Sequence, residues 1–403
     1  MKEGWKYMKL GEIATTINGL WKGKKEPFVN VGVIRNANFT KDITLDFSKI
    51  EYLNVEERQY QKRKLQKGDL IVEKSGGSEK QPVGRTVLFN AEGEFSVSNF
   101  TSILRINNQN EITPEFLYKY LLYIYREGWT KEMQNATTGI HNIIFEKFLA
   151  ISTPIPPLSE QQRIVTYLDA EFAKIEALKA NAEKQLQAAK DLFQAALKDL
   201  LTPKEGWVEK KLKEVGKTQT GSTPSKSNAN YYGNYIPFIR PAELNFNNNG
   251  EIKYDSEVKL SESGANCSRV IDENSVLMCC IGSIGKIGFT TLKVTCNQQI
   301  NTITPCSDYN ARFIYYALLS PDFQEEAIKI ANSARATLAI ISKGKWENIF
   351  IPIPPRKEQQ RIADRLDALS ANVKALQMNY TETITLCNDL KQALLKKVFE
   401  EDG

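Results

Sequence analysis

The sequence reads PIPPLSEQQRI at residues 154–164 and PIPPRKEQQRI at residues 352–362. Nine of the eleven positions are identical across an offset of 198 residues, and a long stretch with heptad-like spacing follows each copy. Chance rarely gives that much identity at half the length of a chain. The sequence therefore predicts a tandem duplication, in which each unit is a globular part followed by a helix.

Each copy is expected to begin a helix of about 36 residues, which would be about 54 Å long. In the first copy, Ser159 is the predicted N-cap, with Gln162 at the capping-box spacing, and Thr202-Pro203 is the predicted end. Apolar residues then recur at steps of three and four, which places them on one face. They are Ile164, Leu168, Phe172, Ile175, Leu178, Ala182, Leu186, Ala189, Phe193, Ala196 and Leu200, and Ile362, Leu366, Leu369, Val373, Leu376, Tyr380, Ile384, Cys387, Leu390, Leu394 and Val398.

Neither apolar stripe could be buried against its own globular part along its whole length. We expect the two helices to pack on each other, because one chain carries both partners. The alternative is that each helix dimerises with a helix of a separate chain.

Composition places the chain among ordinary globular proteins. It has 403 residues, enough for two or three domains, and 41% of them are hydrophobic. It contains no apolar run long enough to cross a membrane and no apolar core of a signal peptide near Met1, so a cytoplasmic protein is expected. The net charge of +5 is mildly basic, which is compatible with a nucleic-acid partner.

The cysteines do not predict a metal site. All six lie in the second half of the chain, none forms a C-x-x-C pair, and His141 is the one histidine that could assist them. A zinc site needs closely spaced ligands, so reduced and mostly buried thiols are expected instead.

The two globular parts share a framework. Strands are expected at residues 28–34, 70–72, 85–89 and 102–106, with a loop at 73–80 and an aromatic-rich helix at 116–125. Residues 31–35, 69–72 and 116–119 are echoed by residues 236–240, 275–278 and 313–316. The loops between these segments differ in length and sequence. Two modules doing one kind of job on different targets, or plain drift after duplication, would both give this pattern.

Catalytic motifs are not found. His141 has no neighbour that recommends it as a base, and residues 282–288 lack both the P-loop spacing and the G-x-G-x-x-G spacing. Acidic residues near Asp322 have the wrong spacing to a lysine for a metal-dependent nuclease, and a solvated helix face is expected there. The chain is therefore predicted to have no active site of its own.

Binding residues are more prominent, because both modules carry basic and amide side chains in predicted loops. Lysine and arginine neutralise phosphates, whereas asparagine, glutamine and arginine can hydrogen-bond base edges. A solvated surface role is the alternative for any single residue, so the set carries the prediction. The DNA-binding candidates are Lys22, Lys24, Lys25, Arg35, Lys74, Lys80, Arg85, Asn99, Thr137 and Thr138 in the first module, and Thr223, Lys226, Arg240, Lys286, Asn297, Gln298, Gln299 and Arg335 in the second.

Over its whole length the sequence resembles the specificity subunits of type I restriction–modification enzymes. The resemblance rests on the repeated P-I-P-P-x-x-E-Q-Q-R-I motif with its helix, and on residues 231–239, 283–286 and 297–301. The first module departs from the second at residues 75–78 and 98–101. The fold it implies is α+β, with two tandem α/β target-recognition domains (1–153 and 203–351) separated by two long antiparallel coiled-coil helices (154–202 and 352–403) in a pseudo-two-fold repeat.

The resemblance also implies a division of labour. Each domain would read one half of a split, asymmetric site in double-stranded DNA, and the helix pair would act as a rigid spacer. Free helix faces would dock two adenine-N6 methyltransferase subunits that carry S-adenosylmethionine, and two restriction subunits using ATP and Mg could join. This chain itself would hold no cofactor and no metal. The N-terminal segment would pack near the C-terminal helix.

Two other functions remain open at this point. A self-contained DNA-modifying enzyme would methylate or cut DNA without a partner. A structural coiled-coil adaptor would bind DNA weakly, without regard to sequence and without any effect of loop changes.

Overall fold

The computed structural model describes residues 4–20, 23–79, 81–137, 139–244, 252–332 and 339–400. The chain divides into two compact units, Met1–Asn181 with Thr383–Gly403, and Ala182–Glu382. Each unit holds one α/β domain together with a stretch of both long helices. We call these unit 1 with domain 1, and unit 2 with domain 2.

Domain 1 is built on an antiparallel sheet in the order β2-β9-β5-β7, formed by Ala14–Asn18, Thr101–Ile106, Leu70–Glu73 and Thr86–Leu88. The helix α3 (Pro114–Arg126) packs against it with Phe116 and Leu117 fully buried. Thr113 caps this helix by accepting a hydrogen bond from the Phe116 N–H, and Pro114 follows at its first position. The predicted helix at 116–125 and the predicted strands are therefore confirmed to within two residues.

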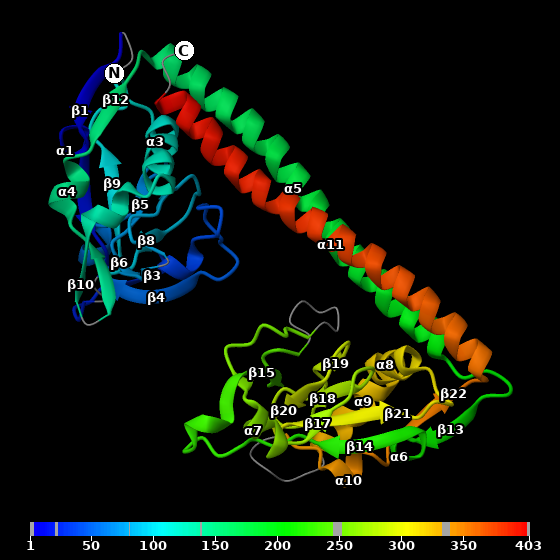
Figure 1. Ribbon diagram of the computed structural model, residues 1–403. Helices are drawn as coiled ribbons and strands as arrows, with labels where there is room; N and C mark the ends of the chain where they lie inside the picture. The colour runs from blue at the N-terminus through cyan, green and yellow to red at the C-terminus, as the bar shows by residue number, and fades with distance from the viewer. Residues whose placement is uncertain are drawn as a thin grey trace. The chain divides into compact units, whose positions relative to one another are not determined.

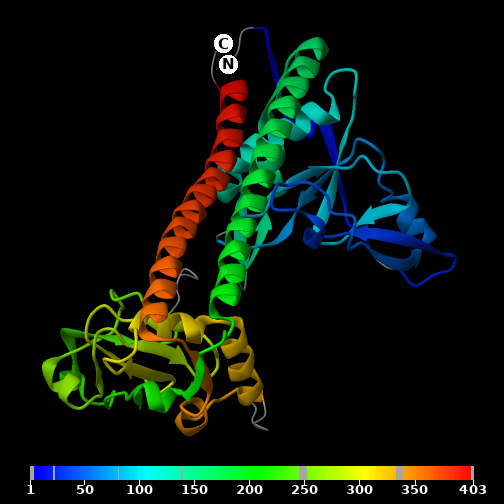
Figure 2. The same cartoon turned by 90° about the vertical axis from the view of Figure 1, so that its right-hand side faces the viewer.

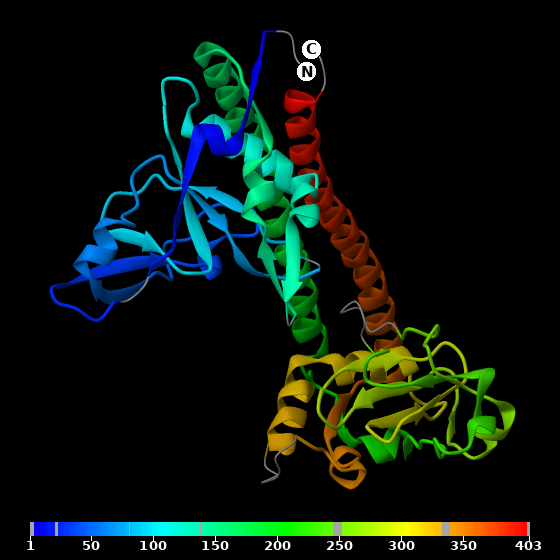
Figure 3. The ribbon, with the colours of Figure 1, turned by 90° about the vertical axis from the view of Figure 1, so that its left-hand side faces the viewer.

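A second sheet of domain 1 has the order β4-β3-β8, formed by Glu51–Glu56, Phe28–Ile34 and Phe95–Val97. In unit 1 this sheet lies away from the helix segments (Figure 2, Figure 3). Strands β3 and β8 are parallel, with Ile34 opposite Val97. A third sheet joins β10 (Gln134–Thr137), β11 (Ile140–Ile143) and β6 (Ser75–Gly77), so the expected loop at 73–80 is wrong in its middle, where β6 pairs with β11.

Domain 2 repeats the first two sheets of this plan (Figure 1). Its first sheet has the order β14-β21-β18-β19, formed by Gly216–Thr220, Ile300–Pro305, Val276–Cys279 and Ile287–Phe289. Its second has the order β16-β15-β20-β17, formed by Lys259–Leu260, Tyr232–Ile239, Val294–Cys296 and Val270–Ile271, with β15 and β20 parallel. The helix α8 (Ala311–Leu319) takes the place of α3, capped by Asn310 and followed by α9 (Pro321–Asn332).

Short helices complete the two domains. They are α1 (Leu10–Ile13), η1 (Asn36–Asn38), α2 (Glu57–Gln61), η2 (Trp129–Met133) and α4 (Phe145–Leu149) in domain 1, and α6 (Leu212–Val215), η3 (Ala229–Tyr231), α7 (Glu262–Asn266) and α10 (Lys343–Trp346) in domain 2.

A two-stranded ribbon leads into each long helix. β1 (Lys6–Lys9) pairs with β12 (Ser152–Ile155) before α5 (Leu158–Leu201), and β13 (Val208–Lys211) pairs with β22 (Phe350–Ile353) before α11 (Arg356–Phe399). Each helix has 44 residues, which is longer than predicted. The predicted N-cap is wrong as well. Ser159 lies inside α5, because the Pro157 carbonyl accepts hydrogen bonds from the Glu160 and Gln161 N–H groups, so the helix begins at Leu158, two residues earlier than a Ser159 cap implies.

The repeated motif locks each helix to its domain. Gln161 is fully buried, and its Nε2 donates to the carbonyls of Glu111 and Pro156 at 2.8 Å while its Oε1 accepts from the Thr113 N–H at 2.8 Å. Gln359 repeats this role with the Asn310 N–H and the Pro354 carbonyl, both at 2.9 Å. The first glutamine of the motif therefore satisfies backbone groups at the start of α3 or α8.

Within each unit, the segments of α5 and α11 lie side by side (Figure 1, Figure 2). The buried or half-buried seam runs through residues 168, 172, 175, 179, 182, 186 and 189 of α5, and 366, 370, 373, 377, 380, 384, 387 and 391 of α11. Three predicted seam residues are therefore wrong, because Leu178, Leu376 and Leu390 are exposed. Lys179, Gln377 and Lys391 occupy the seam instead, at equally regular steps of three and four.

The seam lysines of unit 1 have acidic partners from domain 1 and from α5. Lys179 contacts Asp42 at 3.1 Å, and Lys391, which is almost fully buried, lies 3.6 Å from Asp42 and pairs with Glu176. Burial alone would raise the pKa of Asp42, but the hydrogen bond from Lys179 and the charge of Lys391 outweigh it and hold that pKa below its ordinary value. The two seam lysines are thus paired with Asp42 from a loop of domain 1 and with Glu176 from α5 itself.

The N-terminal segment packs near the end of α11, as the resemblance implied. Trp5 meets Phe116 edge to face at 6.4 Å between ring centroids, and Phe116 meets Phe399 at 5.8 Å. In unit 2, Trp207 meets Phe313 in the same way, at 6.3 Å, and Leu197 and Leu201 of α5 join that core. Among the described residues, the structure contains no helix long and apolar enough to cross a membrane.

Candidate nucleic-acid interface

An arginine ends the central strand of the second sheet in both domains. Arg35 follows β3, and its N–H donates to Asn38 Oδ1 at 2.9 Å; Arg240 follows β15, and its N–H donates to Glu243 Oε2 at 2.9 Å. Asn38 and Glu243 are both buried. The two turns are therefore equivalent, each held by a polar side chain three residues after the arginine.

Each arginine also meets a carboxylate. Arg35 pairs with Glu51 of β4, and Arg240 pairs with Glu243, from Nη2 to Oε1 at 2.7 Å. The hydrogen bond to Glu243 raises the pKa of Arg240, although burial opposes this. Both arginine side chains stay partly exposed, with 42% and 35% of their surface accessible. They are held in place while a face remains open to a ligand.

A second turn lies beside each arginine, at the end of the parallel neighbour strand. After β8, the Ser98 N–H donates to the Ile34 carbonyl at 2.9 Å; after β20, the Asn297 N–H donates to the Ile239 carbonyl at 3.1 Å. The Phe100 N–H then donates to Ser98 Oγ, and the Gln299 N–H donates to Asn297 Oδ1. Parallel strands lie about 4.8 Å apart, so each turn adjoins an arginine.

A glycine approaches the backbone of this turn closely in both domains. A Cβ at Gly19 would lie 1.7 Å from the Ser98 carbonyl oxygen, and a Cβ at Gly221 would lie 2.2 Å from the Asn297 carbonyl oxygen. No other residue fits so close an approach to the backbone. The arginine turn, the turn after the neighbouring parallel strand and the glycine against it therefore occur in the same arrangement in both domains.

The two turns present a side-chain amide at the same position. Asn99 and Gln298 each follow the residue that anchors the turn, and both are exposed. Gln298 Oε1 accepts a hydrogen bond from Thr223 Oγ1 at 2.6 Å. Asn297 and Gln299, in contrast, bond to each other at 2.8 Å and shape the turn.

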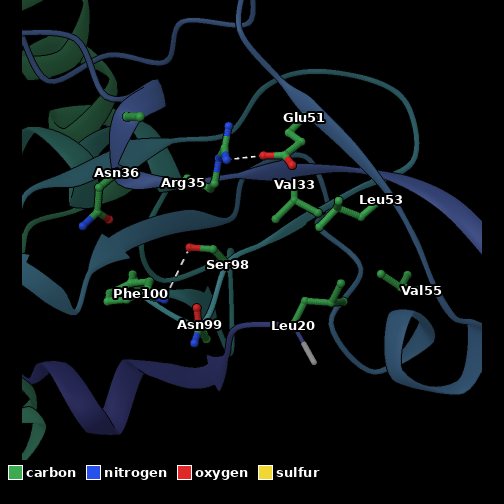
Figure 4. Close-up of a pocket in the computed structure, with 11 residues that line it drawn as sticks. Leu20, Val33, Arg35, Asn36, Glu51, Leu53, Val55, Ser98, Asn99 and Phe100 are labelled. Atoms are coloured by element: carbon green, nitrogen blue, oxygen red, sulfur yellow. Dashed lines mark hydrogen bonds and ion pairs between the residues drawn. The ribbon is translucent and has the colours of Figure 1, made fainter. Parts of the chain in front are cut away.

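In domain 1 the arginine and the amide line one open cleft of about 550 Å³ (Figure 4). Leu20, Val33, Leu53 and Val55 form an apolar wall, and the rest is formed by Arg35, Asn36, Ala37, Glu51, Ser98, Asn99 and Phe100. Arg35 Nε and Asn36 Oδ1 are buried without a hydrogen-bond partner among the described residues. A cleft with an apolar wall and a few convergent polar groups is typical of a binding site.

The two domains differ at one equivalent basic position. Arg85 is paired bidentately with Glu73 at 2.7 and 2.9 Å, with the two side chains only 11% and 2% exposed. Burial alone would lower the pKa of Arg85, but Glu73 offsets this and raises it. In domain 2 the Cys279 N–H bonds to the Lys286 carbonyl as the Glu73 N–H bonds to the Arg85 carbonyl, so Cys279 replaces the carboxylate. Lys286 is exposed, and its Nζ lies 3.5 Å from the Pro241 carbonyl beside Arg240.

The remaining predicted residues fall into two groups. Lys24, Lys25 and Lys226 are exposed on loops, whereas Lys74 is half-buried, donates to Asn18 Oδ1 at 3.4 Å and has its pKa lowered by burial. Lys22, Lys80, Thr138 and Arg335 lie outside the described residues, as does the side chain of Thr137.

Sequence reasoning missed the supporting residues of the interface. Asn36, Phe100, Asn38 and Glu243 line the cleft or hold the arginine turn. The signal was present as a polar residue three positions after an arginine that ends a strand, at 35–38 and at 240–243. Within the described part of the chain, no three His, Cys, Asp or Glu side chains come together as metal ligands.

Comparison with known proteins gives matches along the whole chain. The family model described as the type I restriction modification DNA specificity domain matches residues 2–188 and again 204–386. The specificity subunit of the type I restriction enzyme HindI of Haemophilus influenzae is 25% identical over 88% of this chain and 90% of its own length. The EcoKI specificity subunit of Escherichia coli is 25% identical over 99% of this chain and 89% of its own length.

Solved structures share the fold. A chain from work on assembly and conformational transition of the type I R-M system has a TM-score of 0.78 at 21% identity, and the match covers 100% of this chain and 99% of that one. The HsdS subunit of Thermoanaerobacter tengcongensis has a TM-score of 0.55 at 21% identity, covering 100% and 98%.

Proposed function

The chain belongs to the family of type I restriction–modification DNA specificity domains, and from this premise we propose that it selects the DNA sequence on which a partner methyltransferase acts. The observation that carries the proposal is the interface built twice. Each domain holds an arginine turn and an amide turn at the ends of its parallel strand pair. One such reading surface per domain is what a bipartite site requires.

Each domain reads one half of a split, asymmetric site. The backbone framework of the two surfaces is the same, but their chemistry differs, because domain 1 neutralises Arg85 with Glu73 while domain 2 leaves Lys286 exposed. Phosphate contacts from exposed lysines would add affinity without sequence preference, and groups in the turns would add preference. Two domains with the same backbone scaffold can therefore read half-sites of different sequence.

The long helices set the spacing between the half-sites and dock the partners. In unit 1 the exposed apolar residues include Leu178 and Leu390; in unit 2 they include Leu376 and Leu192. Residues 178 and 376, and residues 192 and 390, are 198 positions apart, so the repeat places leucine twice at the same exposed positions. Exposed leucines at the same two repeat positions in each unit suit two copies of one methyltransferase subunit.

This chain contributes recognition and no catalysis. The adenine-N6 methyltransferase subunits carry S-adenosylmethionine, and two restriction subunits that use ATP and Mg can join the complex. The family membership and the two reading surfaces support this division.

Methylation mapping tests the proposal. Single-molecule sequencing would compare DNA from cells that express this chain with a cognate methyltransferase against cells that lack the chain. We expect a bipartite motif with one methylated adenine in each half, on opposite strands. Exchanging residues 1–150 for a related domain should change one half only, and a change in both halves would contradict modular reading.

Spacing has its own test. Seven-residue insertions in both helices, within 179–191 and 377–389, keep the three-four seam and should lengthen the unread spacer while both half-sites persist. An unchanged spacer would count against a spacing role for the helices. Methylation or cleavage by the purified chain alone would favour a self-contained enzyme, and binding without sequence preference would favour an adaptor.

A further inference from the structure

Residues 99 and 298 occupy one structural position in two different domains. The residue before each donates its N–H to the last residue of the arginine strand, and the residue after each donates its N–H back to that anchor's side chain. Both positions are exposed at the tip of the turn. The surrounding anchors differ in identity, since serine holds one turn and asparagine the other.

The side chains at this position are the same chemical group. An amide offers one acceptor and one donor pair, which matches the N6 and N7 atoms of adenine in the major groove. Gln298 Oε1 already accepts from Thr223 Oγ1, which fixes the amide orientation and leaves one lone pair for a base. Asn99 reaches the same position from a shorter side chain, at the edge of the cleft that Arg35 also lines.

We infer that residues 99 and 298 are matched specificity-determining positions, each of which places its amide against the major-groove edge of an adenine in the half-site read by its own domain. This inference rests on the proposed function. The neutral amides have little to gain from phosphates, whereas the neighbouring Arg35 and Arg240 carry the charge that phosphates attract. Loss of an amide therefore changes sequence preference, and loss of a charge changes affinity for all sequences.

The experiment uses the full chain with a cognate methyltransferase and the genomic DNA of the expressing cells. The variants are Asn99→Ala, Gln298→Ala, Asn99→Gln and, as a matched control, Glu92→Gln. Glu92 is an exposed residue that precedes β8, at the end of the strand opposite the turn. Thermal unfolding of each purified variant checks that these surface changes leave the fold intact.

We expect Asn99→Ala to relax one base of the first half-site and to leave the second unchanged, with Gln298→Ala giving the mirror result. The preference for adenine at the affected position should fall about 5- to 150-fold, the range for loss of one bidentate base contact. Asn99→Gln keeps the amide and should keep adenine. Glu92→Gln should give the wild-type motif.

Three results would overturn the inference: an unchanged motif in both alanine variants, relaxation of both half-sites by one variant, or uniformly weaker methylation with the motif intact. Failure of the proposed function can be distinguished from failure of this inference, because the wild-type chain would then produce no bipartite motif at all.

Discussion

Replacing Gln161 by alanine should destabilise unit 1 far more than replacing the adjacent Gln162. Gln161 is fully buried and makes three hydrogen bonds of 2.8 Å to backbone groups, whereas Gln162 is exposed and donates to Thr166 Oγ1 at 3.3 Å. Three bonds at about 1 kcal/mol each, plus about 1 kcal/mol for the one buried methylene that is lost, give about 4 kcal/mol for Gln161→Ala. Gln162→Ala should stay within about 0.5 kcal/mol.

Calorimetry and hydrogen exchange would measure the effect. For a unit of this size, about 4 kcal/mol corresponds to a fall in Tm of roughly 8–16 °C in the transition of unit 1. Exchange should quicken at the start of α3, where the Thr113 N–H loses its acceptor, and stay unchanged at the start of α8. Gln161→Met keeps the side-chain volume but not the hydrogen bonds, so it should recover only the part of the lost unfolding free energy that comes from packing.

A matched change in unit 2 extends the test. Gln359 makes two of these bonds and is equally buried, so Gln359→Ala should cost about 3 kcal/mol, about three-quarters as much, and affect α8 instead. Equal shifts for Gln161→Ala and Gln162→Ala, or a shift below about 1 kcal/mol for the first, would refute the role assigned to the motif.

Further expectations concern charge and docking. Glu73→Gln removes the carboxylate charge that balances buried Arg85 and should cost about 3–5 kcal/mol by calorimetry, whereas Lys286→Met should leave stability unchanged and lower the salt dependence of DNA binding by about one phosphate contact. Because the folded-state pKa of Asp42 lies below its ordinary 3.8, the stability it contributes is present above that pH and is lost as pH falls through the folded value. Below about pH 4, the free energy of unfolding of Asp42→Asn should therefore fall less steeply with decreasing pH than that of the wild type. Parallel plots of unfolding free energy against pH for the two proteins would contradict this. Leu178→Asp combined with Leu390→Asp should reduce bound methyltransferase from two copies to one by native mass spectrometry, and two copies bound at wild-type affinity would exclude this docking surface.

Much of the fold could be predicted from local patterns. The strand at 28–34 was placed at its observed bounds, and the helix at 116–125 lies inside α3, because β-branched runs and a capped apolar periodicity specify these elements locally. The start of α5 was misplaced at Ser159, since the proline carbonyl that begins the helix leaves no side-chain signature.

The candidate site was predictable in composition but not in arrangement. Arginine, lysine and amide residues stood out in the loops, yet only the structure separates Arg85, which is tied to Glu73, from Lys286 at the equivalent position. Pairing across strands brings residues 35 and 99 together, and their sequence separation gives no sign of it. The base preferences of the two domains stay a prediction.

By itself, the sequence determined the duplication, the two long helices and the class of protein, because identity, periodicity and motif spacing are properties of the chain alone. Only the tertiary structure decided which face of those helices forms the seam. Leu178 and Lys179 both fit steps of three and four, and hydrophobicity favours the leucine. The lysine is half-buried there because Asp42, 137 residues away, supplies the opposing charge. A partner so distant in sequence makes a buried charge tolerable, and no local pattern can reveal it.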